Sequence, residues 1–240
     1  MKIALASESF INKDIEYNLF IIFEALRKYS KKVDLICFGE AFLQGFDSLS
    51  WNYEKDKKIA IKKNSIIIKR ICEKAKEANC AVSFGYFEKD NEDLYCSYMF
   101  VGSNGEIINN YRRVSIGWKE YTKTDFHYKE GNCFESFLYK DKRFICALCG
   151  DLWYDENIKL INDIEKDIVL WPLFVSYDLD KWKEELIDYN LQASKLQNPV
   201  LLINSISENS NGGCYYFNRG KIVKSLPMGK EGYLIIELQL

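Results

Sequence analysis

The chain has 240 residues, of which 48% are hydrophobic and 28% are charged, and its formal net charge at pH 7 is -2. This length and composition predict a single domain over residues 1–240, with enough apolar side chains for a sizeable core. Acidic and basic residues are mixed along the whole sequence, without the basic stripe that contacts nucleic acid, so we expect no nucleic-acid partner.

Two patterns alternate along the chain. Short segments rich in Val, Ile, Cys, Phe and Tyr predict strands, and longer segments with apolar residues three or four positions apart predict helices. In chain order these are a strand over 2–7, a helix over 14–29, a strand over 33–39, a helix over 55–79, strands over 80–87, 94–101, 106–111 and 143–149, a helix over 155–165, a strand over 167–174, a helix over 180–196, and strands over 199–205, 214–217 and 232–238. This alternation indicates an α/β protein.

The strands are expected to form mixed sheets. Near-continuous apolar strands, such as 33–39 and 143–149, are typical of parallel strands that are buried on both faces. The strands over 94–101 and 106–111 are joined by a Ser-Asn-Gly-Glu turn, in which Asn-Gly supplies the positive φ angles of a tight hairpin. Parallel and antiparallel pairs are therefore expected in the same architecture.

The first residues and the cysteine content bear on the cellular compartment. Residues 2–7 have the pattern of a short strand rather than of a signal peptide, and no apolar run approaches the length that spans a bilayer. We therefore expect a cytoplasmic protein without a membrane partner. The eight cysteines are then expected to be free thiols in a reducing compartment, with most of them in the core.

Cys146 and Cys149 have the Cys-x-x-Cys spacing that in other proteins binds zinc or performs redox chemistry. On a strand, residues three apart point to opposite faces, and no second cysteine or histidine pair is present to complete a site, so we expect no metal. Cys149 ends its apolar strand, where α/β sheets usually present their sites, and Asp151 is expected to fix the turn that follows. Cys149 is therefore the predicted nucleophile, and Cys146 a core residue.

A cysteine nucleophile needs a nearby base or positive charge. The one histidine, His127, lies in a polar segment and is expected to be solvated. Glu40 directly follows an apolar strand, where an acidic residue is either a helix cap or a site residue. A third segment, 111–120, has the same form and places Arg112 and Arg113 just after a strand; of these, Arg112 is expected to be a solvated neighbour.

Together these three segments resemble the carbon-nitrogen hydrolase (nitrilase) superfamily, whose members carry Glu, Lys and Cys in this chain order. Glu40 in FGEAFLQGF matches the family's Pro-Glu-x-x-x-x-Gly-Tyr segment. Cys149 in CGDLWYDE matches the Cys-Tyr-Asp-x-Arg-Phe-Pro-Glu segment. The segments that follow, as far as GGCYYFNRGKIV at 212–223, keep the family's layout, so the resemblance covers nearly the whole chain.

The sequence departs from the family at the lysine. In the family's Tyr-x-Lys-x-His-Leu segment, the lysine falls on Arg113 and the histidine on Ser115. Arginine keeps a positive charge that stabilises an oxyanion, but it does not readily exchange a proton, and it is bulkier than lysine. Lys119 is an alternative source of the charge. The family's second glutamate corresponds to either Glu120 or Asp125.

The resemblance implies an α/β fold built as a four-layer α-β-β-α sandwich with mixed sheets. It also implies a hydrolase acting on a non-peptide carbon-nitrogen bond, in a small carboxamide or an N-carbamoyl compound. Glu40 would be the general base, Cys149 would form a thioester, and Arg113 with a backbone amide would stabilise the oxyanion. No metal or organic cofactor is needed, and the expected partners are the small-molecule amide and a second copy of the chain in a homodimer.

The walls of the substrate pocket are expected to come from the loops beyond the strands. Alternatively, the large aromatic residues among these candidates are core residues. The candidates are Glu120, Asp125, Trp153, Trp171 and Phe174. A second hypothesis remains beside the enzyme, in which the chain is a catalytically weakened nitrilase-fold protein with a binding or assembly role.

Overall fold

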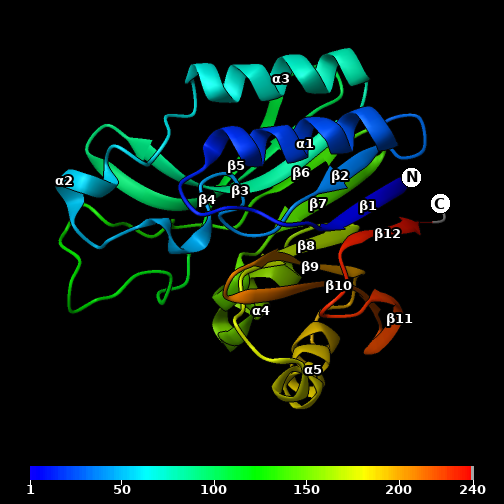
Figure 1. The fold of residues 1–240 in the computed structure, drawn as a ribbon. Coiled ribbons are helices and arrows are strands. Elements are labelled where there is room, and N and C mark those ends of the chain that lie inside the picture. The colour runs from blue at the N-terminus through cyan, green and yellow to red at the C-terminus, as the bar shows by residue number, and fades with distance from the viewer. Residues whose placement is uncertain (239–240) are drawn as a thin grey trace.

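Two six-stranded sheets lie face to face between two groups of helices in the computed structural model, which describes residues 1–238 (Figure 1). The two ends of the described chain lie near each other, with the last strand beside the first. The predicted four-layer α-β-β-α sandwich is therefore confirmed. Within residues 1–238, no helix combines the length and the apolar character needed to cross a bilayer.

The elements have the following bounds. The first sheet contains β1 (Lys2–Ser7), β2 (Leu35–Cys37), β3 (Ala81–Asp90), β4 (Asp93–Val101), β5 (Ile107–Arg112) and β12 (Gly232–Glu237). The second sheet contains β6 (Ser136–Tyr139), β7 (Lys142–Cys146), β8 (Ile168–Leu173), β9 (Val200–Ser207), β10 (Ser210–Asn218) and β11 (Lys221–Leu226). The helices are α1 (Ile15–Tyr29), α2 (Tyr53–Asp56), α3 (Ile66–Ala78), α4 (Asp155–Asp163) and α5 (Leu179–Ser194), with short 3-10 turns η1 (Phe46–Ser48) and η2 (Cys149–Trp153).

Each sheet has parallel strands at its centre and antiparallel strands at its edges. The first sheet has the order β12-β1-β2-β3-β4-β5, in which β1, β2 and β3 are parallel. The second has the order β11-β10-β9-β8-β7-β6, in which β7, β8 and β9 are parallel. The carboxyl ends of parallel strands are where open α/β sheets present their sites, so the segments after β2, β7 and β8 are the first places to look for function.

Helices α1 and α3 cover the outer face of the first sheet (Figure 1). Each begins at a polar cap: Asp14 accepts a hydrogen bond from a backbone N–H of α1, and Ser65 accepts one from α3. Leu19, Ile22 and Leu26 recur at the spacing of one helix face, and all three are buried. The predicted helical periodicity therefore corresponds to packing on the sheet.

The inner faces of the two sheets pack on each other through large apolar side chains. Phe100 of β4 contacts the second sheet, where the centroid of its ring lies 5.0 Å from that of Phe137, 5.2 Å from that of Tyr139 and 5.6 Å from that of Phe144. Phe100 and Phe144 are fully buried. Since the sheets have no covalent link at this point, such contacts hold their relative position.

The structure differs from the predicted elements in three places. The expected helix over 55–79 is interrupted, because Ile61 pairs with Glu88 as an isolated bridge and Ser65 starts a new helix. The expected strand over 143–149 ends at Cys146, and Cys149 belongs to the η2 turn. Strands β6 and β11 were not predicted, since β6 is only four residues long and β11 is an exposed edge strand with little apolar patterning.

We expect the substitution Phe100→Ala to lower the free energy of unfolding by about 3–5 kcal/mol, because it removes an aromatic ring between the sheets and leaves a cavity. Urea titration followed by tryptophan fluorescence measures this quantity. Phe126→Ala is the matched control, since that side chain is 73% exposed and its loss should change stability by no more than about 0.5 kcal/mol. Equal effects of the two substitutions would contradict the assigned core.

Candidate active site

Glu40 lies just beyond the carboxyl end of β2, where the chain passes over β3. Gly85 of β3 makes this passage possible, because a Cβ atom there would lie 2.3 Å from the backbone nitrogen of the residue after Glu40. The Glu40 carboxylate is fully buried. It accepts hydrogen bonds from Arg113 Nη1 at 2.9 Å, from the backbone N–H of Phe174 at 3.1 Å and from Cys96 Sγ at 3.4 Å.

Arg113 directly follows the edge strand β5, and its side chain is only 4% exposed. The backbone N–H of Arg113 donates to the carbonyl of Cys96 at 2.9 Å, which continues the pairing of β5 with β4. All three guanidinium nitrogens have partners: Nη1 donates to Glu40, Nε to Ser115 Oγ at 2.9 Å and Nη2 to the carbonyl of Ile116 at 3.3 Å. The guanidinium is therefore held in one orientation.

Arg112, expected from the sequence to be a solvated neighbour, is instead partly buried in a separate ion-pair network. Its Nη2 lies 2.7 Å from Glu88 Oε1 and 2.6 Å from Asp90 Oδ2. Successive strand residues point to opposite faces of a sheet, so the pairing of β5 directs Arg113, and not Arg112, toward Glu40.

Cys149 opens the η2 turn shortly after β7 and is partly exposed. Its φ of +40° lies in the left-handed region, which costs a residue other than glycine about 1 kcal/mol or more. Trp171 Nε1 donates to the carbonyl of Cys149 at 2.9 Å and holds the strained residue in place. The Cys149 thiol donates to the carbonyl oxygen of Phe174, with the sulfur at 3.9 Å.

Phe174 links the groups of the two sheets through its backbone. It directly follows β8, and its N–H donates to Glu40 while its carbonyl accepts from Cys149. Its ring stacks on Phe46 with centroids 4.4 Å apart. Glu40 from the first sheet and Cys149 from the second are thus held by the same residue, which sets the distance between a carboxylate and a thiol.

Asp151 connects the turn that follows Cys149 to the segment that carries Arg113. It is fully buried, and it accepts hydrogen bonds from the backbone N–H of Leu148 at 2.7 Å, from Tyr111 Oη at 2.5 Å and from the backbone N–H of Ser115 at 2.6 Å. These contacts give Asp151 the turn-fixing role that the sequence predicts, and they extend that role to the loop of the arginine.

Burial and neighbouring charge set the protonation of the three groups. Burial raises the pKa of Glu40, and the charge of Arg113 opposes this rise. Burial, followed by the charge of Glu40, raises the pKa of the Cys149 thiol to about 12. Burial opposes the charged form of Arg113, but Glu40 and the surrounding acidic groups raise its pKa. At neutral pH a protonated thiol therefore lies beside a permanent cation and a carboxylate of increased basicity.

The arrangement of Glu40, Arg113 and Cys149 lies in a chain that matches a known protein family. The family model described as carbon-nitrogen hydrolase matches residues 3–240. The chain belongs to the carbon-nitrogen hydrolase family. In this member of the family, the three groups that the sequence motifs predict, Glu40, Arg113 and Cys149, meet at one place between the two sheets.

Two curated relatives are similar to this chain over part of its length. An arylacetonitrilase of Hypocrea virens is 32% identical over 114 residues, which are 45% of this chain and 34% of the relative. A cyanide hydratase of Botryotinia fuckeliana is 28% identical over 166 residues, which are 62% of this chain and 44% of the relative. The chain thus spans less than half the length of either relative.

Two solved structures share the fold over nearly the whole chain. An amidase of the nitrilase superfamily from Nesterenkonia AN1 is 15% identical with a TM-score of 0.80, covering 99% of this chain and 90% of the amidase. A glutamine-dependent NAD+ synthetase from Acinetobacter baumannii is 19% identical with a TM-score of 0.82, covering 98% of this chain and 44% of the synthetase. At these identities, the two structures support the fold alone.

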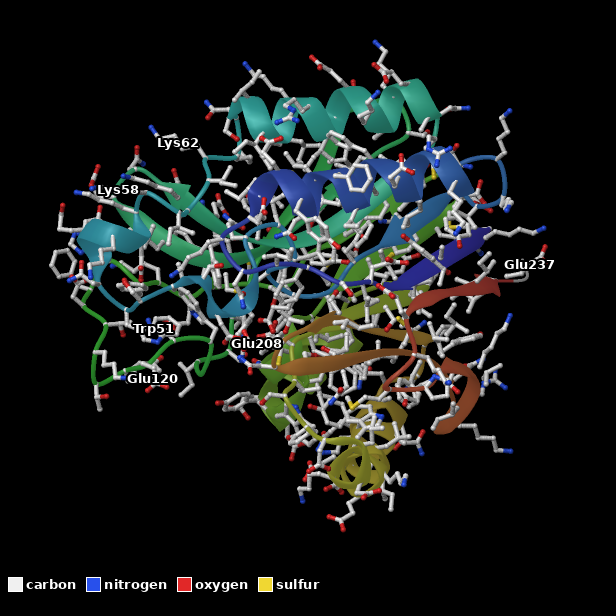
Figure 2. All side chains as sticks on the ribbon, viewed as in Figure 1. Trp51, Lys58, Lys62, Glu120, Glu208 and Glu237 are labelled. Carbon is white, nitrogen blue, oxygen red and sulfur yellow. The ribbon has the colours of Figure 1, made fainter. Side chains whose placement is uncertain are left out.

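The structure does not bring the predicted acidic residues or the alternative lysine to Glu40. Glu120 is exposed on the long loop on the side of α2 (Figure 2). Asp125 pairs with His127 at 2.9 Å, and Lys119 pairs with Glu130 at 2.8 Å. In the part of the chain that the structure describes, none of these contacts reaches the site. The cation beside Glu40 is therefore Arg113, and the assignments of Glu120 and Asp125 to substrate binding gain no geometric support.

The aromatic candidates have mixed positions. Trp171 is fully buried and, through Nε1, supports the backbone of Cys149, so its indole is a positioning group rather than an open pocket wall. Trp153 is 38% exposed and packs edge-on against Tyr189 with ring centroids 5.0 Å apart. Phe174 contributes its backbone to the site, as described above. The sequence alone did not indicate which of these rings would be exposed.

Sequence reasoning missed two contacts of the site. Cys96 of β4 donates to Glu40, but a cysteine in an apolar strand has the pattern of a core residue. Ser115 accepts from Arg113, although in the sequence it stood only as a replacement of the family's histidine. No local pattern distinguishes Cys96 from its neighbours, because its partner Glu40 is 56 positions away. Ser115 is only two positions from Arg113, but the sequence does not show that its hydroxyl faces the guanidinium.

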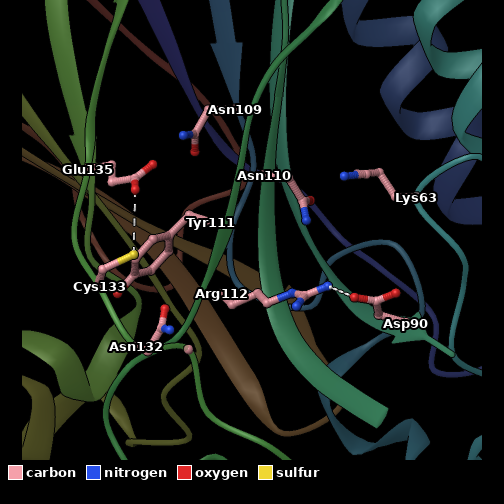
Figure 3. A pocket seen from close by; sticks show the side chains of 10 residues that line it. Lys63, Asp90, Asn109, Asn110, Tyr111, Arg112, Asn132, Cys133 and Glu135 are labelled. Atoms are coloured by element: carbon pink, nitrogen blue, oxygen red, sulfur yellow. Dashed lines mark hydrogen bonds and ion pairs between the residues drawn. The ribbon is translucent and has the colours of Figure 1, made fainter. Parts of the chain in front are cut away.

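Several hollows in the described part of the chain lie outside Glu40, Arg113 and Cys149, and two of them are near the segments of the site. One of about 350 Å³ borders β5, and its lining includes Arg112, which pairs with Asp90, and Cys133, whose thiol donates to Glu135 at 3.7 Å (Figure 3). Its lining does not include Glu40, Arg113 or Cys149. The other, of about 430 Å³, adjoins Phe174. Its lining residues are Asp47, Phe174, Ser176, Tyr177, Asp178, Glu208, Asn209 and Asn211.

We expect Glu40→Gln to lower the pKa of the Cys149 thiol below about 12, because the carboxylate charge is one of the causes that raise it. The rate of alkylation by iodoacetamide, followed as a function of pH with peptide mapping, measures this shift. At pH 8.5, Cys149 of the variant should therefore react faster than Cys149 of the parent protein.

Cys133 is the internal control, since it is exposed and does not contact Glu40. Its alkylation profile should be the same in the parent protein and in the Glu40→Gln variant. If the alkylation rate of Cys149 has the same pH dependence in the variant as in the parent, or is shifted to higher pH, the carboxylate does not raise the pKa of this thiol.

Proposed function

We propose that this carbon-nitrogen hydrolase is a small-molecule amidase that hydrolyses a carboxamide or an N-carbamoyl compound through a thioester on Cys149. The observation that carries the proposal is the convergence of the Cys149 thiol, the buried Glu40 carboxylate and the fixed Arg113 cation around the backbone of Phe174. A nucleophile, a base and a stabiliser of negative charge are the three parts that acyl transfer requires.

The first half of the reaction forms the thioester. Glu40 accepts the proton of the Cys149 thiol as the sulfur adds to the carbonyl carbon, so the high thiol pKa is overcome by direct transfer to a nearby base. The tetrahedral oxyanion is stabilised by the Arg113 charge and by a backbone N–H of the turn after Cys149. The protonated Glu40 then gives its proton to the leaving nitrogen, and ammonia or an amine departs.

The second half hydrolyses the thioester. Glu40, again ionised, takes a proton from a water molecule that attacks the acyl carbon, and the second tetrahedral oxyanion meets the same positive charge. Collapse of this intermediate expels the Cys149 sulfur, which recovers a proton from Glu40, and the carboxylic acid leaves. The hollow beside Phe174 is the proposed entrance, because it adjoins the residue that holds both reacting groups.

The identity of the cation favours an amide over a nitrile as substrate. An amide carbonyl develops a negative oxygen that a fixed charge stabilises without any proton exchange. A nitrile nitrogen must instead gain protons as the thiol adds, and arginine does not release one near neutral pH. Arg113, whose pKa is raised further by its acidic neighbours, therefore supports oxyanion stabilisation.

The alternative is a catalytically weakened protein that keeps the fold for binding or assembly. The positions of Glu120 and Asp125, which do not contact Glu40, support it. Against it, the chain retains a buried ion pair and a cysteine with a φ of +40°, and both features carry an energetic cost that a scaffold without catalysis does not require. We therefore favour the enzyme.

The expected activity is release of ammonia from short aliphatic amides or N-carbamoyl amino acids, measured with a coupled glutamate dehydrogenase assay. Cys149→Ala should abolish it, and Glu40→Gln should lower kcat by about 10²–10⁴-fold, the usual contribution of a general base. Quenched reactions should contain an acyl adduct on Cys149, detected by mass spectrometry. Full activity of Cys149→Ala would refute the mechanism, and turnover of nitriles or cyanide without amides would refute the substrate class.

The dependence of kcat/KM on pH should report the base. Glu40 acts only when ionised, and burial raises its pKa above the ordinary value of 4.5, so activity should be lost as the pH falls through a midpoint above 4.5. Initial rates between pH 4 and pH 9, at pH values where circular dichroism shows the protein to be folded, measure the midpoint. A midpoint below 4.5 would exclude Glu40 in this environment as the base.

A further inference from the structure

The space beside the Arg113 guanidinium is made by a glycine. A Cβ atom at Gly150 would lie 2.3 Å from Arg113 Nη2 and 2.9 Å from Ser115 Oγ. Distances below about 3 Å essentially do not occur for real Cβ atoms, so any larger residue at position 150 would have to displace the guanidinium. Gly150 is the residue directly after Cys149, and the guanidinium therefore packs against the backbone of the nucleophile's own turn.

Backbone conformation does not explain this glycine. Gly150 is not among the residues with positive φ, whereas Cys149 beside it adopts a φ of +40° without being a glycine. Position 150 does not need the left-handed conformation that favours glycine, so the requirement there is for space. The group that uses the space is the guanidinium of Arg113.

Hydrogen bonds also hold the guanidinium in this position, which is called the arginine seat below. Ser115 accepts from Arg113 Nε, and the carbonyl of Ile116 accepts from Nη2, while Nη1 is directed to Glu40. Ser115 is itself 4% exposed, and its backbone N–H donates to Asp151. A lysine has one nitrogen where the guanidinium has three, so it cannot make these contacts together.

We propose that Gly150 and Ser115 are positioning residues that seat the Arg113 guanidinium beside Cys149, so that the site is constructed specifically for arginine. This inference rests on the proposed amide hydrolysis and adds which residues place the charge that faces the oxyanion. It follows that Arg113→Lys, although it conserves the charge, lowers the rate. It also follows that a side chain at position 150 is harmful only while arginine is present.

A double-mutant cycle tests the seat. The four proteins are the parent, Gly150→Ala, Arg113→Lys and the combination of both, and kcat and KM are measured for the best amide substrate. We expect Gly150→Ala to lower kcat by about 10-fold or more in the parent and by less than about 3-fold in the Arg113→Lys background, a coupling typical of residues in contact. Because the guanidinium acts on the transition state, KM should change less than kcat.

Ser115→Ala provides a second cycle in case the added methyl group of Gly150→Ala prevents folding, since it removes an atom instead of adding one. It should lower kcat in the parent and have little further effect after Arg113→Lys, because Nε, its donor, is then absent. Equal effects of Gly150→Ala, and of Ser115→Ala, in the two backgrounds would overturn the proposal. So would an Arg113→Lys variant with the full parental kcat.

Failure of the proposed amide hydrolysis and failure of the arginine seat would give different results. If the parent hydrolyses amides and both cycles are additive, the proposed function stands and the arginine seat is wrong. If the parent hydrolyses no amide, the effect of each substitution is measured instead on the midpoint of unfolding in urea and on the alkylation rate of Cys149. Neither measurement needs a substrate. Coupling between positions 113 and 150 in both readouts would then support the seat, and additivity would overturn it.

Discussion

The ion pair between Glu40 and Arg113 is the interaction on which the rest of the site depends. The two charged atoms are 2.9 Å apart, with side chains 0% and 4% exposed. Removing two charges from water costs several kcal/mol per ion, and their attraction compensates only if the remaining donors and acceptors also have partners. The backbone of Phe174 and the oxygens of Ser115 and Ile116 supply those partners.

These partners come from both sheets, which explains why the sandwich must be assembled before the site exists. Glu40 and Arg113 follow strands of the first sheet, and Phe174 and Cys149 follow strands of the second. A shift of one sheet relative to the other would leave a buried charge without its hydrogen bonds. The aromatic packing around Phe100 therefore supports the site indirectly, by holding the two sheets in the position that satisfies the pair.

The same pair acts on the Cys149 thiol, the proposed nucleophile. Burial, and after it the charge of the Glu40 carboxylate, opposes ionisation of the Cys149 sulfur, while the guanidinium favours it, so the thiol keeps its proton. In the proposed mechanism, the thiolate forms only as the carbonyl carbon is attacked. An arginine suits this arrangement because its charge does not change as protons move between Glu40, the sulfur and the leaving group.

The sequence by itself determined the α/β class, most of the strands and helices, and the candidates Glu40 and Cys149, because these depend on residues that are neighbours along the chain. It left open whether Arg113 or Lys119 lay beside Glu40, and it did not reveal that Gly150 packs against the guanidinium. Only the tertiary structure decided these points. Glu40 is 73 positions from Arg113 and 134 from Phe174, so the contacts arise from the pairing and stacking of two sheets, and no local pattern records them.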